Sequence, residues 1–218
     1  MIHVYVICES STATPLPPRR GLGGAQLRAL EHDGLAAVYS RHRSLQPSTD
    51  LVLPHERVVE AVMERGTVLP LRFGTQLRDE QQLRDALASR TRELLETIER
   101  VRGRVELGVR ILGRRQGGGE TARSSGRAYL FSRAEQRRAA DRLAHDVHRP
   151  LARLASESVV STMTTAPTLL AATYLIDREK AAEFRARAEQ LAAGLVGVRA
   201  FVTGPWPPYS FVQLGEQG

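Results

Sequence analysis

Cysteine is almost absent from the 218 residues, which limits the ways in which this chain can be stabilised. The single residue, Cys8, cannot form an intramolecular disulfide. It lies inside the apolar segment 2–8, which we interpret as a first strand and not as a signal peptide, because the segment is short and has no basic leader. A buried, inert thiol in a cytosolic protein is therefore expected.

Long apolar runs and aromatic side chains are also scarce. No apolar run approaches the roughly 20 residues that a membrane-spanning helix needs, so no such helix is predicted. Aromatic residues make up 5% of the chain, so Leu, Val, Ile and Ala must provide most of the buried surface. With 42% hydrophobic and 25% charged residues, the composition is that of an ordinary globular protein.

Lysine is represented by Lys180 alone, so the net charge of +7 comes almost entirely from arginine. A basic chain can bind nucleic acid or an acidic partner surface. Here the arginines are scattered among acidic residues, and the longest basic clusters are pairs such as Arg114-Arg115. We interpret the charge as a compositional bias and not as a nucleic-acid footprint.

The chain also lacks the motifs of catalysis and cofactor binding. It contains no glycine-rich phosphate loop with a lysine, no nucleophile-elbow serine and no C-x-x-C pair. His145 and His148 have a spacing that can hold a metal, but no matching third or fourth ligand is present, and a solvated helix face is the simpler interpretation. We therefore expect no enzyme activity, no cofactor and no metal.

The strongest sign of domain organisation is the segment 113–126, which has consecutive glycines and almost no apolar residue. Such a segment cannot recover its ordering entropy by burial, which predicts a flexible linker. It divides the chain into two predicted domains, 1–112 and 127–218.

Hydrophobic periodicity and turn residues predict the elements of the first domain. The expected strands are 2–8, a hairpin of 25–31 and 35–40 with Asp33-Gly34 at its turn, 67–73 and 104–111. The expected helices are 55–65, and 79–100 with an apolar stripe of Leu83, Leu87, Leu94, Ile98 and Val101. Because the early hairpin interrupts strict β-α alternation, we predict an α+β class, with a ferredoxin-like and mostly antiparallel sheet carrying helices on one face.

The second domain is expected to be another α+β unit, with long helices and a short sheet. Its expected strands are 127–131, 168–176 and 198–203. Ser132 and Glu135 form a capping box that begins a long helix, which Pro150 ends or kinks, leaving a second piece at 151–157. Asp177 is expected to cap a last helix that runs to residue 195.

A proline-rich motif, Gly204-Pro205-Trp206-Pro207-Pro208-Tyr209, lies near the C-terminus. Proline fixes φ, so we expect the chain to leave the last strand at Gly204 and to present its aromatic side chains in set directions. Two interpretations stay open for this tail. Either Trp206 fills the seam between the domains and the tail is a latch, or Trp206, Tyr209 and Phe211 form an exposed anchor for a partner protein.

Arg72 and Phe73 end a predicted strand and are further candidates for contact with a partner. Arg72 could instead pair with Glu56 or Glu60 on the preceding helix. Glu106 is the lone acid in an apolar strand and could also be its partner, which would make these residues structural ion pairs.

Four segments together resemble the GvpF/GvpL family of gas vesicle proteins. They are residues 55–75, 105–110, 174–179 and 203–212, in the order and approximate spacing of the family. The last segment is the most specific, and the resemblance extends over nearly the whole chain. It implies a non-enzymatic accessory or minor structural protein, located at the gas vesicle in the cytoplasm. It also implies binding to the hydrophobic shell subunit and to other accessory proteins during vesicle nucleation or assembly, with no nucleic acid or membrane as a partner.

Two other classes of function compete with this interpretation. The first is an RNA-binding module on a ferredoxin-like sheet, which would need exposed aromatics on adjacent central strands. In the first domain only Tyr5, Tyr39 and Phe73 are candidates for that role. The second is a small-molecule sensor or enzyme, for which the sequence offers no site.

Overall fold

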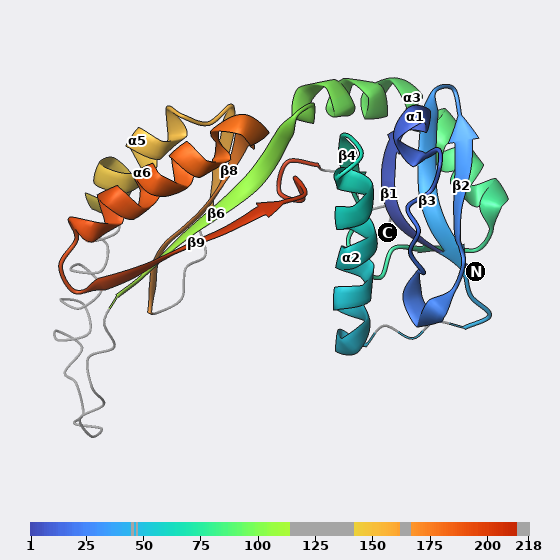
Figure 1. Ribbon diagram of the computed structural model, residues 1–218, viewed down its shortest axis with the longest axis horizontal. Coiled ribbons are helices and arrows are strands. Elements are labelled where there is room, and N and C mark those ends of the chain that lie inside the picture. Colours follow the sequence, from blue (N-terminus) through green and yellow to red (C-terminus); the bar gives the residue numbers. More distant parts are fainter. Residues whose placement is uncertain (45, 47, 114–141, 162–166, 213–218) are drawn as a thin grey trace, which may run out of the picture. The chain divides into compact units, whose positions relative to one another are not determined.

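The computed structural model describes residues 1–44, 46, 48–113, 142–161 and 167–212. The chain forms two compact units, the first built from Met1–Arg104 together with the chain from Trp206 onward, and the second from Val105–Pro205. Each unit combines helices with an antiparallel sheet (Figure 1), which confirms the predicted α+β class. The described part of the chain contains five α-helices.

The sheet of the first unit is built around its first strand. Its elements are β1 (Ile2–Glu9), α1 (Ser10–Ala13), β2 (Leu27–His32), β3 (Leu35–Arg41), α2 (Val52–Met63), β4 (Val68–Pro70), β5 (Gln76–Leu77) and α3 (Glu80–Val101). The strand order is β2-β3-β1-β4, and the two-residue β5 also pairs with β1. Every pairing is antiparallel, and the predicted hairpin is confirmed: Asp33 and Gly34 have φ of 45° and 82° in the turn between β2 and β3.

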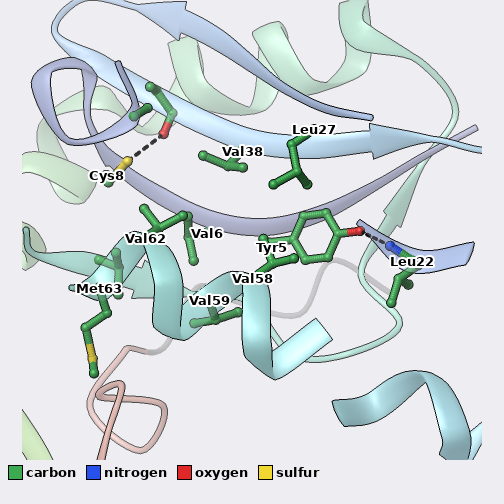
Figure 2. Close-up of a cluster of buried hydrophobic side chains, with 13 residues drawn as sticks. Tyr5, Val6, Cys8, Leu22, Leu27, Val38, Val58, Val59, Val62 and Met63 are labelled. Carbon is green, nitrogen blue, oxygen red and sulfur yellow. Dashed lines mark hydrogen bonds between the residues drawn. The ribbon is translucent and has the colours of Figure 1, made fainter. Parts of the chain in front are cut away.

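Helices lie on both faces of this sheet and not on one face as predicted. Val58, Val59 and Val62 of α2 pack on the face that carries Tyr5, Val6, Cys8 and Val38, as Figure 2 shows. On the opposite face, the hydroxyl of Tyr39 donates a hydrogen bond to Glu80 in the first turn of α3. The reason is visible in β1, where residues 2–8 are all buried without alternation, as expected for a strand covered on both sides.

The helices of the first unit follow their predicted apolar stripes. All five stripe residues of α3 are buried, and Asp79 caps its N-terminus by accepting a hydrogen bond from the backbone N–H of Gln82 at 2.9 Å. Helix α2 begins three residues earlier than predicted, and its predicted face of Val58, Val59, Val62 and Met63 is buried. The Cys8 thiol is fully buried as predicted, and burial raises its pKa to about 12.

The second unit contains a four-stranded sheet with helices on one face (Figure 1). Its elements are β6 (Arg104–Gly113), a π-helical turn (Ala144–His148), α5 (Arg149–Ala152), β7 (Glu157–Val160), β8 (Thr168–Asp177), α6 (Ala181–Ala193) and β9 (Val198–Trp206). The strand order is β7-β8-β6-β9. Strand β6 and helices α5 and α6 share one buried core, which contains Leu107, Ile111, Leu151, Phe184 and Ala188.

The strand predicted at 104–111 belongs to this second sheet, although the sequence analysis assigned it to the first domain. Alternation correctly identified its buried apolar side chains, among them Leu107 and Ile111, but not the burial of Glu106. A period of two also does not identify the sheet in which a strand pairs. The helix predicted at 151–157 is also wrong, because α5 ends at Ala152 and β7 begins at Glu157. From residue 114 on, the predicted linker lies outside the described residues, as do the strand at 127–131 and the capping box of Ser132 and Glu135.

Candidate functional site

The C-terminal segment 207–212, which we call the C-terminal latch, is bound to helices of the first unit at two points. The hydroxyl of Tyr209 donates to the carboxylate of Glu56 on α2, at 3.0 Å from Oε1 and 3.1 Å from Oε2. The Nη2 of Arg100 on α3 donates to the carbonyl of Phe211 at 2.5 Å. The latch therefore connects the two helices that cover opposite faces of the first sheet.

The latch is also held by packing. Pro207 and Pro208 are buried, and Phe211 is 4% exposed. The ring of Tyr209 packs against the core cluster beneath α2. Burial raises the pKa of Glu56, the Tyr209 hydroxyl partly opposes this, and nearby Glu60 adds to it. Of the predicted anchor residues, Tyr209 and Phe211 are thus mainly internal to the first unit.

Trp206 is the predicted anchor residue that stays exposed, with 45% of its surface accessible. The chain does not leave the strand at Gly204 as predicted, because β9 continues to Trp206 through a cis Gly204-Pro205 bond. Gly204 has a φ of 101°, which favours glycine at this position. The guanidinium of Arg185 on α6 donates to the carbonyls of Val202 at 2.9 Å and Gly204 at 2.6 Å, which fixes the strand just before the indole.

The second candidate pair, Arg72 and Phe73, lies in the chain between β4 and β5. Arg72 is exposed, whereas Phe73 is half-buried. The Phe73 ring packs at centroid distances of 5.9 Å from His3 and 5.8 Å from His55. Glu106 is 7% exposed on β6 in the second unit.

Sequence reasoning missed a pair of buried histidines beside Phe73. His3 of β1 and His55 of α2 are both fully buried, and His3 Nε2 lies 2.9 Å from His55 Nδ1. His55 Nε2 lies 2.9 Å from the carbonyl of Leu71, which can only accept a hydrogen bond. The tautomers follow: His55 carries its proton on Nε2, and His3 carries its proton on Nε2 and donates to His55.

This arrangement keeps both imidazoles neutral. Burial, reinforced by His55 and His42, lowers the pKa of His3 to about 3. Burial lowers the pKa of His55 to about 4, against the opposing effect of its bond to the Leu71 carbonyl. In this tautomer His3 Nδ1 is a bare acceptor, and it has no hydrogen-bond partner among the described residues. The sequence signal for the pair was a histidine inside an apolar strand, together with one at the start of an apolar helix face.

The remaining candidates from the sequence, His145 and His148, contact other side chains of the second unit. His145 is exposed and contacts Asp146 at 2.9 Å, while His148 Nδ1 lies 3.0 Å from the hydroxyl of Tyr174. Within the described ranges, no group of three His, Cys, Asp or Glu residues is arranged to hold a metal ion. No helix in the described part of the chain has the length and apolar character needed to cross a membrane.

Two of the three aromatic side chains that could serve an RNA-binding sheet, Tyr5 and Tyr39, are enclosed in the first unit. Tyr5 is fully buried and Tyr39 is 3% exposed. The hydroxyl of Tyr5 accepts from the backbone N–H of Leu22 at 2.8 Å and pairs with Ser40 Oγ at 2.7 Å. Side chains enclosed in this way cannot stack with bases.

Comparison with known proteins gives consistent matches over the chain. The family model described as gas vesicle synthesis protein GvpL/GvpF matches residues 1–213. Gas vesicle protein L of a Streptomyces species is 28% identical, over 99% of this chain and 94% of that protein. Gas vesicle protein F1 of Halobacterium salinarum is also 28% identical, over 89% of this chain and 85% of its own length.

Two crystal structures share the fold. The gas vesicle protein GvpF of an Anabaena species aligns with a TM-score of 0.81 at 21% identity, covering 99% of this chain and 97% of that chain. GvpF of Microcystis aeruginosa aligns with a TM-score of 0.77 at 20% identity, covering 98% and 99%.

Proposed function

The chain belongs to the GvpL/GvpF family of gas vesicle synthesis proteins, and we propose that it is a non-enzymatic accessory protein that binds the hydrophobic shell subunit during vesicle nucleation or assembly. We propose that it also contacts other accessory proteins and acts at the gas vesicle in the cytoplasm. The observation that carries this proposal is the match of the family model to residues 1–213, which leaves only the last five residues unmatched. Its membership of the family implies a role in gas vesicle formation.

The need for such a protein follows from the chemistry of a hydrophobic shell subunit. A subunit whose apolar surface is to be buried against its neighbours exposes, before assembly, a larger apolar patch than a soluble monomer tolerates. A protein that covers this patch reversibly would prevent aggregation and deliver the subunit to the growing wall.

Trp206 is the side chain that we propose as a contact in this role. Its indole is 45% exposed at the end of β9, on a backbone fixed by the Arg185 guanidinium and the prolines on either side of it. A large aromatic side chain held in a set direction provides contact area at little entropic cost. We therefore favour Trp206 over Tyr209 and Phe211, whose contacts lie inside the first unit.

The test is co-purification of the tagged protein with the shell subunit, for the wild type and for Trp206→Ala. The matched control is Phe201→Ala, which removes another β9 aromatic with 47% exposure. We expect the wild type and the control to retain the shell subunit, and Trp206→Ala to bind it about tenfold more weakly. Absence of binding by the wild type would overturn the proposed function. Equal binding by the two variants would overturn only the role of Trp206.

A further inference from the structure

Strand β9 forms one edge of the second sheet. In the strand order β7-β8-β6-β9 it pairs with β6 on one side, and no strand of the described part of the chain lies on its other side. It has nine residues, whereas β7 at the opposite edge has four. A long open edge offers backbone N–H and C=O groups to an additional strand.

One half of this edge is already covered by a side chain. The guanidinium of Arg185 on α6 donates to the carbonyls of Val202 and Gly204. These residues are two positions apart, so their carbonyls point to the same side of the strand. Because β6 occupies the inner side of β9, the guanidinium covers the outer side and takes the place of a pairing strand there. In the described ranges, no side chain is hydrogen-bonded in this way to the backbone of residues 198–201.

The side chains of β9 alternate between the two faces of the sheet. Three apolar side chains pack against the core beneath α5 and α6, and they are Val198, Ala200 and Val202. The residues between them point to the opposite face, where Arg199 and Phe201 are exposed. Phe201 has 47% of its surface accessible, so the uncovered half of the edge carries an exposed aromatic ring.

Strand β6 brings a second arginine to this exposed face. Gly108 lies beside Thr203, since a Cβ at Gly108 would meet the Thr203 hydroxyl at 2.7 Å. The strands β6 and β9 run in opposite directions (Figure 1), so Arg110, two residues after Gly108, is level with Phe201. Arg110 is also exposed. The Phe201 ring therefore has one arginine beside it on each of the two strands.

The charges of these two arginines are available to a partner. Neither Arg110 nor Arg199 forms a hydrogen bond or an ion pair with another residue that the structure describes. Glu106, on the same face of β6, is 7% exposed and already has an interaction partner. Pairing of β9 with the same edge of a second copy would bring like charges together, which is destabilising. An acidic segment is the complementary occupant.

We propose that the edge of β9 at residues 198–201 pairs with an extended, acidic segment of another gas vesicle accessory protein. The assignment rests on the proposed function and identifies one surface for the contacts with accessory proteins. Backbone hydrogen bonds to residues 198–201 hold the segment, an apolar side chain packs beside Phe201, and a carboxylate pairs with Arg199 or Arg110.

The experiment measures the fluorescence anisotropy of a labelled synthetic peptide that alternates valine and glutamate, titrated with the whole chain. A peptide that alternates valine and lysine is the charge control, and the valine–glutamate peptide methylated on its backbone nitrogens is the pairing control. We expect the unmodified valine–glutamate peptide to bind at least about tenfold more tightly than either control. Equal binding of the lysine peptide would overturn the acidic partner, and equal binding of the methylated peptide would overturn strand pairing.

Substitutions assign the binding to this edge. Arg199→Glu should weaken binding of the valine–glutamate peptide about tenfold or more, whereas Arg187→Glu, the same change of charge at an exposed position of α6, should leave it within about twofold. Phe201→Ala should also weaken peptide binding, although it retains the shell subunit. If Arg199→Glu binds the peptide as tightly as the wild type, the site is wrong.

Two further measurements separate this assignment from its alternatives. Sedimentation of the wild type without peptide tests for a second copy at the edge, and a dimer that dissociates when the peptide is added would overturn the accessory protein as the occupant. Binding of the shell subunit without binding of the peptide would overturn this assignment alone. Binding of the peptide without binding of the shell subunit would leave the edge site in place and overturn the proposed function.

Discussion

The buried histidine pair predicts a loss of stability in mild acid. In the folded chain the pKa of His3 is lowered to about 3 and that of His55 to about 4. In the unfolded chain both residues return to a pKa of about 6.5. Below that value the unfolded chain takes up two protons that the folded chain does not, so the free energy of unfolding falls as the pH decreases. The stabilisation is complete above about pH 7.5 and is lost progressively towards pH 4.

The size of the effect follows from these pKa values. At about pH 5, proton uptake stabilises the unfolded chain by about 2 kcal/mol for each histidine. The pair therefore lowers the free energy of unfolding by about 4 kcal/mol between about pH 7.5 and pH 5, a large part of the stability of an ordinary domain. Protonation of either ring inside the folded chain is unfavourable, because His55 Nδ1 already accepts a hydrogen bond from His3 and both rings are fully buried.

Urea unfolding followed by far-UV circular dichroism at the two pH values measures this loss. In His3→Gln, whose amide can still donate to His55, one titrating group is removed, and the loss attributed to the pair should fall by about 2 kcal/mol. His145→Gln removes an exposed histidine and is the matched control. If the two variants lose the same free energy as the wild type between pH 7.5 and pH 5, His3 is not held neutral by the fold, and the tautomer argument is wrong.

Two further substitutions test the packing and the latch. Leu87→Ala should lower the free energy of unfolding by about 2–5 kcal/mol, because Leu87 is fully buried, whereas Leu95→Ala, at 37% exposure on the same helix, should cost less than about 0.5 kcal/mol in urea titrations. Equal costs would contradict the predicted stripe. Tyr209→Phe removes the two contacts to Glu56, so stability should fall by about 1–2 kcal/mol and the pKa of Glu56, read by carboxyl NMR, should rise further. An unchanged pKa of Glu56 would show that the hydroxyl does not reach the carboxylate in solution.

Local sequence patterns predicted the elements of the first unit well where the pattern of a single segment was sufficient to define the element. The stripe of α3 from Leu83 to Val101 is confirmed, and so is the Asp33-Gly34 hairpin, since spacing and turn chemistry are properties of the segment itself. The two-sided burial of β1 was misjudged because a short continuous apolar run does not by itself reveal how many helices cover it. His3 within that run is buried as completely as its apolar neighbours.

The sequence did not reveal which segments far apart in the chain contact one another. The alternation at Leu107 and Ile111 is the same whichever sheet a strand joins, so the assignment of β6 to the second sheet required the structure. The candidate site was predicted only in part for the same reason. The proline-rich tail was identified as a rigid element with two possible roles, but nothing in its own residues pairs Tyr209 with Glu56, which lies 153 positions earlier in the chain.

The C-terminal latch is held by helices on both faces of the first sheet. The Tyr209 hydroxyl is bound to Glu56 on α2, and the Phe211 carbonyl is bound to Arg100 on α3. Because these contacts join the last described residues of the chain to the first unit, the stability of that unit should decline in variants that release the latch, such as Tyr209→Phe.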